Sequence, residues 1–275
     1  MAEVKSAREH KIKSFSLRKP ASLRVILVPV SLLLAVLIWD LLTRLGSFPA
    51  FILPSPGHVW EKFLQVASNG TLVRHSLYTL VEVIAGLALG VTVATLLGYL
   101  LAKSPVVERL ISPYIVASQA VPIVAIAPLM VIWFGPGIAS KVLICSLIVF
   151  FPVLINTIVG VRSVPEDLRD LMRSINATRW QNIKMLEIPG ALPIFLGGLR
   201  IGATLAVIGA VVGEFIGADR GLGFLINRAR GQYDTALVFV AVLALVVLAL
   251  SLYGVVTGLG SRLISWQQRP ETFRR

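Results

Sequence analysis

The chain has 275 residues, of which 56% are hydrophobic and only 15% are charged, and it carries a net charge of +12. Its hydrophobicity excludes intrinsic disorder, and so little charge could not cover the surface of a water-soluble domain of this length. The single cysteine, Cys145, excludes a disulfide framework or a thiolate metal cluster, and the three histidines all lie in the first third of the chain. This composition is typical of an integral membrane protein.

Six stretches are apolar over about 20 residues, the length that a bilayer-spanning helix needs. They are Val25–Leu42, Ser76–Ala102, Ile111–Trp133, Val142–Gly160, Leu192–Gly217 and Ala236–Gly258. We expect an all-α protein with about six transmembrane helices in a transmembrane domain at 25–260. A basic leader at 1–24 precedes this domain, and a tail at 261–275 follows it. The first stretch ends without a small-x-small cleavage site, so we expect a retained helix rather than a signal peptide.

The distribution of basic residues predicts the orientation. If both termini lie in the cytoplasm, 18 of the 26 Lys and Arg residues lie inside, seven lie outside and Arg200 lies within a span. This bias follows the positive-inside rule, so the net charge is explained by membrane topology rather than by nucleic-acid binding.

Small residues recur at four-residue spacing within the predicted spans. The pairs are Gly86/Gly90, Gly198/Gly202, Gly209/Gly213 and Gly254/Gly258. Such pairs let two helix backbones approach closely in lipid. They indicate either packing within the chain or a moving interface with a partner subunit.

The third span contains prolines that should break its helix. Pro122 and Pro128 lie inside it and Pro113 lies at its entry, and an interior proline removes a backbone hydrogen bond. Carbonyl groups freed in this way are tolerated where protein or a water-filled cavity covers them. Residues from Gln119 to Pro128 therefore either line a transport pathway or form a structural kink.

Two carboxylates in the spans need an explanation, because burying such a group in hydrocarbon is costly. Glu82 and Glu214 should each face the interior of the helix bundle, a cavity or a partner. Both are candidates for the pathway or its gate. For Glu214, which lies just before a predicted outer loop, a structural hydrogen bond to that loop explains the position equally well.

Motifs of enzymes are absent from the sequence. It contains no His-Glu-x-x-His, no Gly-x-Ser-x-Gly and no phosphate-binding Gly-x-x-x-x-Gly-Lys-Ser/Thr. We therefore expect a protein without catalytic residues, metal or bound cofactor. Any ATP and Mg²⁺ that drive its work must be bound by another chain.

The segment from Val161 to Glu187 differs from every other loop. Leu168, Leu171, Met172 and Ile175 form one apolar stripe of a helix. Ser163 with Glu166, and Thr178 with Gln181, are predicted capping boxes, and Asn176 tolerates the left-handed turn between the two helices. This amphipathic hairpin either lies on the membrane surface or docks into a groove of a cytosolic partner, and its balanced charges favour docking.

The hairpin resembles the EAA loop of permease subunits of binding-protein-dependent ABC importers. The resemblance rests on Asp170-Leu171-Met172-x3-Asn176, on Ala177-Thr178-Arg179-Trp180 and on Ile188-Pro189. Further similar motifs are Leu53-Pro54-Ser55-Pro56, Trp133-Phe134-Gly135, Phe150-Phe151-Pro152 and Gly213-Glu214-Phe215. Together they extend from about Leu53 to Trp266. They are similar to the nitrate, sulfonate and taurine group, which includes permeases for thiamine precursors and riboflavin.

The chain departs from the usual motif in the loop itself. Asp170 stands where the family has Glu, Leu171 and Met172 stand where it has Ala, and Asn176 stands where it has Gly. Bulkier side chains at two of these positions indicate a partner groove shaped to accept them. The departures bear on individual contacts rather than on the role of the loop.

The resemblance implies a type I ABC importer permease fold, called MetI-like, in the plasma or inner membrane. It implies a homodimer with two cytoplasmic ATPase subunits and an external solute-binding protein. It also implies that the coupling loop, residues 161–189, contacts the ATPase through Asp170, Leu171, Met172, Asn176, Ala177, Trp180, Ile188 and Pro189.

The alternative is a secondary transporter or channel, which would have relay charges at mid-membrane and usually an internal repeat. The sequence shows no clear repeat and few such charges. The candidate pathway residues include no arginine cluster of the kind that an oxyanion site needs. This favours a vitamin or pyrimidine precursor over nitrate, sulfonate or taurine.

Overall fold

A computed structural model describes residues 21–46 and 48–264, and this part of the chain is helical with no strand. It forms two units, one ending at Phe48 and the other beginning at Pro49. The first unit contains α1 (Ala21–Leu45), which covers the first predicted span. Most of the predicted leader, and the end of the predicted tail, lie outside the described residues.

Long helices dominate the second unit, and four of the described helices are long and apolar enough to cross a membrane. The four candidate spans include α3 (Thr71–Lys103), α6 (Ile138–Arg162), α9 (Ile188–Gly217) and α11 (Thr235–Leu263). They coincide with the second, fourth, fifth and sixth predicted spans. Apolar side chains on their outer faces, such as Leu96 and Val247, are exposed in the chain alone, as a bilayer requires.

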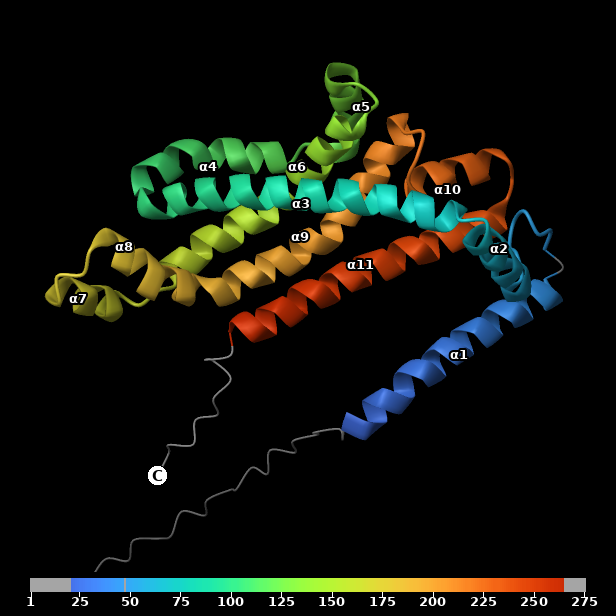
Figure 1. Cartoon of the computed structure of the whole chain (residues 1–275), viewed down its shortest axis with the longest axis horizontal. Helices are drawn as coiled ribbons and strands as arrows, with labels where there is room; N and C mark the ends of the chain where they lie inside the picture. Colours follow the sequence, from blue (N-terminus) through green and yellow to red (C-terminus); the bar gives the residue numbers. More distant parts are fainter. Residues whose placement is uncertain (1–20, 47, 265–275) are drawn as a thin grey trace, which may run out of the picture. The chain divides into compact units, whose positions relative to one another are not determined.

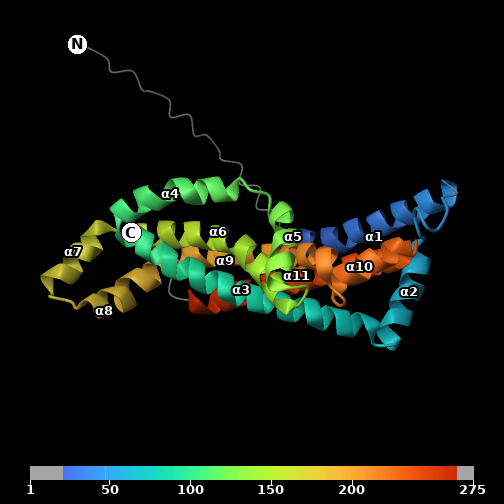
Figure 2. The ribbon, with the colours of Figure 1, turned by 90° about the horizontal axis from the view of Figure 1, so that it is seen from above.

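Shorter helices connect and cover the long ones. They are α2 (Pro56–Ser68), α4 (Pro105–Gln119), α5 (Ile123–Phe134), α7 (Glu166–Ser174), α8 (Arg179–Asn182) and α10 (Leu222–Gly231). A π-helical turn at Ile183–Glu187 joins α8 to α9, so the second helix of the predicted hairpin continues directly into a span. The helices α7 and α8 of the predicted hairpin lie at one end of the long helices, and α2 and α10 lie at the other (Figures 1 and 2).

The third predicted span is not one kinked helix. It is split into α4 and α5, which meet at an angle of 94° across a break at residues 120–122. Pro122 explains the position of the break, because it lacks an amide hydrogen and disfavours a helical conformation at the residue before it. Pro128, which we expected to break the span as well, lies inside α5, and Pro113 lies inside α4.

The core of the second unit forms where α6 packs along both α3 and α9. Glycines make this close approach possible. A Cβ atom on Gly90 would lie 2.7 Å from the carbonyl oxygen of Ser146, and one on Gly209 would lie 2.8 Å from the Cα of Cys145. The glycine pairs on α3 and α9 therefore serve packing within the chain. The pair in α11, Gly254 and Gly258, has no such neighbour within 4 Å in the described part of the chain.

Candidate functional site

The coupling loop presents apolar side chains to its surroundings. On α7, Leu168 is 44% exposed and Leu171 is 56% exposed, and Ile175 follows at the end of the helix with 64%. Trp180 on α8 is 68% exposed. Burying an apolar side chain of this size stabilises a contact by about 1.5–3 kcal/mol. A partner that buries these side chains would therefore bind with a substantially more favourable free energy.

The turn between α7 and α8 forms as the sequence indicates. Asn176 has a φ of 52°, in the left-handed region that asparagine tolerates. The amide of Ala177 donates to the carbonyl of Met172 at 2.9 Å and satisfies the end of α7. The predicted capping box of Thr178 and Gln181 is present in both directions, at 3.3 and 2.8 Å.

The predicted capping box of Ser163 and Glu166 is wrong. The N-cap residue of α7 is Pro165, which offers no side-chain hydrogen bond. The hydroxyl of Ser163 instead donates to the carbonyl of Gly160 at 2.8 Å, because Ser163 still belongs to the end of α6. The start of α7 is supported by the negative charges of Glu166 and Asp167 in its first turn.

The coupling residues occupy two places. Asp170, Leu171, Asn176 and Trp180 are exposed on the hairpin, where Asp170 pairs with Arg173 at 2.9 Å, while Met172 and Ala177 are half-buried. Ile188 and Pro189 lie apart from these, in the first turn of α9, where Ile188 is 53% exposed. The hairpin is thus one surface, and the Ile-Pro pair marks the start of the following span.

A cavity of about 590 Å³ lies between α4 and α6. Its lining is largely apolar, with Gln119 from the end of α4 and Ser112 among the few polar residues. Of the pathway candidates, only Gln119 is among the residues that line it. Pro122 and Pro128 are exposed, at the break and in α5.

Glu82 and Glu214 lie together in a second cluster, formed by α3, α9 and the start of α10. Glu214 is 1% exposed and accepts hydrogen bonds from the hydroxyl of Thr79 at 2.6 Å and from the amide of Gly223. Thr79 accepts from the amide of Leu222 at 2.8 Å. Glu82 is 5% exposed and interacts with Glu214. The cluster ties the start of α10 to the two spans.

Two further residues complete this end of the bundle, and neither role was predicted from the sequence. His75 accepts a hydrogen bond from the amide of Gly221 at 3.0 Å through its Nδ1. Lys141 is 2% exposed, and its ammonium group donates to the carbonyl of Gly217 at 2.9 Å, at the end of α9. These contacts join residues far apart in the chain, which spacing along a sequence cannot predict.

Residues 86–265 match the family described as the inner membrane component of binding-protein-dependent transport systems. The chain is 46% identical to the riboflavin transport system permease protein RibX of Chloroflexus aurantiacus, over 87% of this chain and 90% of that protein. It is 36% identical to the formylaminopyrimidine transport permease protein ThiX of Halalkalibacterium halodurans, over 86% and 94%. A chain of the inward-facing MetNI methionine ABC transporter has the same fold, with a TM-score of 0.61 at 19% identity, over 72% of this chain and 97% of that one.

Fold and relatives together define a multi-pass membrane permease with the MetI-like fold that the sequence predicted. The chain belongs to the family of inner membrane components of binding-protein-dependent transport systems. It is a permease subunit of an ABC importer and not an enzyme, because its relatives are permeases and ATP hydrolysis is the task of a separate subunit. This membership decides against a secondary transporter or channel.

Proposed function

We propose that two copies of this chain form a homodimeric pathway, and that two ATP-binding subunits dock on its coupling loops. The observation that carries the proposal is the exposed apolar surface of α7 and α8, which includes Leu171 and Trp180. Helix-in-groove docking buries a face of this kind. An external binding protein would deliver the solute to the opposite end, where α2 and α10 lie.

The proposed orientation places the coupling loop and both termini in the cytoplasm. It is supported by the excess of basic residues in the segments assigned to the inside. Binding of ATP and Mg²⁺ by the partner subunits would draw the coupling loops together and open the pathway outward. Hydrolysis would then return it inward. The chain itself would bind no cofactor and would move as packed helices.

The proposed pathway follows the break between α4 and α5, from Gln119 through Pro122 to Pro128. Its support is the cavity beside α4, to which Gln119 contributes. Glu82 and Glu214 lie near the other end of α3 and α9, so we assign them to the structure or gating of the outer end.

The proposed solute is riboflavin or a pyrimidine precursor of thiamine. The names of two relatives, one 46% and one 36% identical, support this class. Proteoliposomes holding the whole transporter and its binding protein should take up labelled riboflavin or aminopyrimidine and leave taurine outside. Uptake of taurine alone would overturn the assignment and leave the permease function intact.

Charge reversal in the hairpin tests the docking surface. Asp170→Lys or Trp180→Glu should leave the permease in the membrane but abolish most ATP-dependent uptake, because the ATPase no longer seats on the loop. Matched controls lie at the other end of the unit: Asp219→Lys, on a side chain 84% exposed, and Trp60→Glu, on a residue 60% exposed. The controls should keep the ATPase bound during purification. Normal uptake by the Asp170→Lys and Trp180→Glu variants would contradict the docking assignment.

A further inference from the structure

The corner between α3 and α4 is held by both flanks of the coupling loop. The helix α3 ends at Lys103, Ser104 caps α4 by accepting from the amide of Val107 at 3.4 Å, and Pro105 begins α4. The chain reverses here, and α4 leads back from the end of α3 and diverges from it (Figures 1 and 2). Leu101 to Glu108 form what we call the α3–α4 corner.

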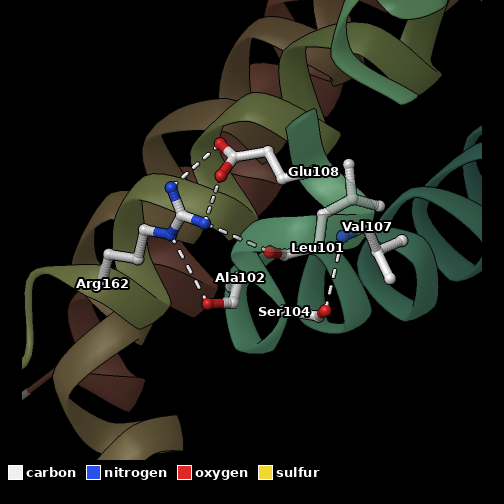
Figure 3. A network of polar contacts seen from close by, with 6 residues as sticks. All are labelled: Leu101, Ala102, Ser104, Val107, Glu108 and Arg162. Atoms are coloured by element: carbon white, nitrogen blue, oxygen red, sulfur yellow. Dashed lines mark hydrogen bonds and ion pairs between the residues drawn. The ribbon is translucent and has the colours of Figure 1, made fainter. Parts of the chain in front are cut away.

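Arg162, the last residue of α6, contacts this corner from the N-terminal end of the coupling loop. Its guanidinium donates to both carboxylate oxygens of Glu108, at 2.9 and 2.5 Å. It also donates to the carbonyls of Leu101 at 3.2 Å and Ala102 at 3.4 Å, as Figure 3 shows. One planar group thus pairs with α4 and satisfies the free carbonyls at the end of α3.

Glu187, the last residue before α9, contacts the corner from the C-terminal end of the coupling loop. It is 2% exposed, pairs with the ammonium group of Lys103 and accepts from the hydroxyl of Tyr99 at 2.9 Å. It ends the π-helical turn, a geometry found often at functional sites. A displacement of either end of the hairpin therefore acts on the same corner.

Few other contacts hold α4 against the rest of the unit, and the half-buried Ile115 is its residue that packs against the hydrophobic core. The helix α4 has no buried residue, and the cavity of about 590 Å³ separates part of it from α6. Within the described part of the chain, the pair of Glu108 with Arg162 is the one side-chain hydrogen bond or ion pair that joins α4 to another helix. Movement of the end of α6 would therefore reach α4 chiefly through Arg162.

The coupling helix is fastened to the same place. Arg169 on α7 donates to the carbonyl of Val161 at 2.8 Å, one residue before Arg162. Val164 is 5% exposed, and a Cβ atom on Gly190 would lie 2.9 Å from its side chain, so the two ends of the loop are packed together. The α7 helix, the end of α6 and the start of α9 thus form one continuous support for the corner.

We propose that Arg162 and Glu187 are positioning residues that transmit displacement of the coupling loop to the α3–α4 corner, and through α4 to the break at Pro122. The inference rests on the proposed docking of an ATPase to the loop. Arg162 would then do more than set the orientation of the chain in the membrane. Glu108 would be the residue through which the displacement reaches α4, the first helix of the broken span.

Charge exchange in the complete transporter tests this role. In proteoliposomes with the ATPase and the binding protein, Arg162→Glu and Glu108→Arg should each lower the amount of solute imported per ATP hydrolysed by about fivefold. The ATPase should still co-purify and hydrolyse ATP. The double variant, with the charges exchanged, should recover most of this ratio. Arg109→Glu, which reverses an exposed charge next to Glu108, is the matched control and should import normally.

The imported-to-hydrolysed ratio separates transmission from a merely structural role. A structural defect would lower both activities together and leave their ratio unchanged, and that result would overturn the proposal, as would normal import by both single variants. If the charge reversals do not assemble, Arg162→Lys and Glu108→Gln keep the side-chain size, and the same fall in ratio is expected of them. If the wild-type permease does not bind an ATPase at all, that result would instead refute the proposed function itself.

Discussion

Single residues fasten the end of this permease at which α2 and α10 lie, through contacts between distant parts of the chain. Glu214, Thr79 and His75 together accept from the three successive amides at which the loop passes into α10, those of Gly223, Leu222 and Gly221. An unpaired buried polar group costs about 1–3 kcal/mol, so these hydrogen bonds stabilise the junction. The carboxylate of Glu214 is thus first of all an acceptor that holds the loop.

Replacing Glu214 measures this role. Glu214→Gln retains one acceptor oxygen, so we expect uptake to survive with a modest loss and the free energy of unfolding to fall by about 1 kcal/mol. Glu214→Ala leaves the Thr79 hydroxyl and the Gly223 amide without this acceptor and should cost more. Thermal unfolding of the solubilised protein measures both, with the exposed Glu61→Gln as control. Complete loss of uptake in a stable Glu214→Gln variant would show that the carboxylate has a direct part in transport.

The ends of the helices are set by a few local signals, and some of these signals can be recognised in the sequence. The capping box at Thr178 and the left-handed Asn176 are both readable, because they depend on residues close together in the chain. The predicted box at Ser163 is wrong because α6 continues to Arg162, two residues past the predicted span, and Ser163 caps the end of α6. The division of the third span was foreseen in part, since proline breaks a helix only where the surrounding packing does not hold it together.

The contacts of Arg162, Glu187 and Lys141 could not be predicted from the sequence. Each joins residues more than 50 positions apart, and a lone charge near a span end reads equally well as a topology signal. The glycine pairs show the same limit. The glycine spacing predicts close packing of helices, but only the structure shows that α6 packs against α3 and α9.

The turn between α7 and α8 can be tested by backbone preference. Asn176→Gly should preserve uptake, because glycine adopts a positive φ freely. Asn176→Val should lower the stability of the loop by about 1–2 kcal/mol, since a branched side chain clashes in this conformation. Uptake and the amount of co-purified ATPase measure the effect. Equal behaviour of the two variants would contradict the observed turn.

The packing of α9 against α6 gives a second prediction at this scale. Gly209→Ala places a methyl group 2.8 Å from the Cα of Cys145 and should destabilise the protein by about 1–3 kcal/mol. Gly197→Ala, on the same helix but with nothing within 4 Å of its Cβ position, should not destabilise the protein and should raise its stability by up to about 1 kcal/mol, because alanine favours a helix more than glycine does. Thermal unfolding of the two variants gives the comparison. A larger loss in Gly197→Ala would contradict the arrangement of the core.

At the scale of the whole molecule, the chain combines a tightly packed core with a loosely held broken span. The helices α3, α6 and α9 approach one another closely at their glycines and form one packed core. The pair α4–α5 is bent by 94°, and α4 has no buried residue. The hairpin of α7 and α8 is fastened to the core and the corner at once. This arrangement suits a passive permease whose pathway is moved from outside its own spans.

Uptake by purified protein in sealed vesicles tests this claim most directly. The permease should import solute only when the ATPase, ATP and the loaded binding protein are all present, and removal of the ATPase should reduce import to the level of empty vesicles. Import by the permease alone, driven by an ion gradient, would contradict the account.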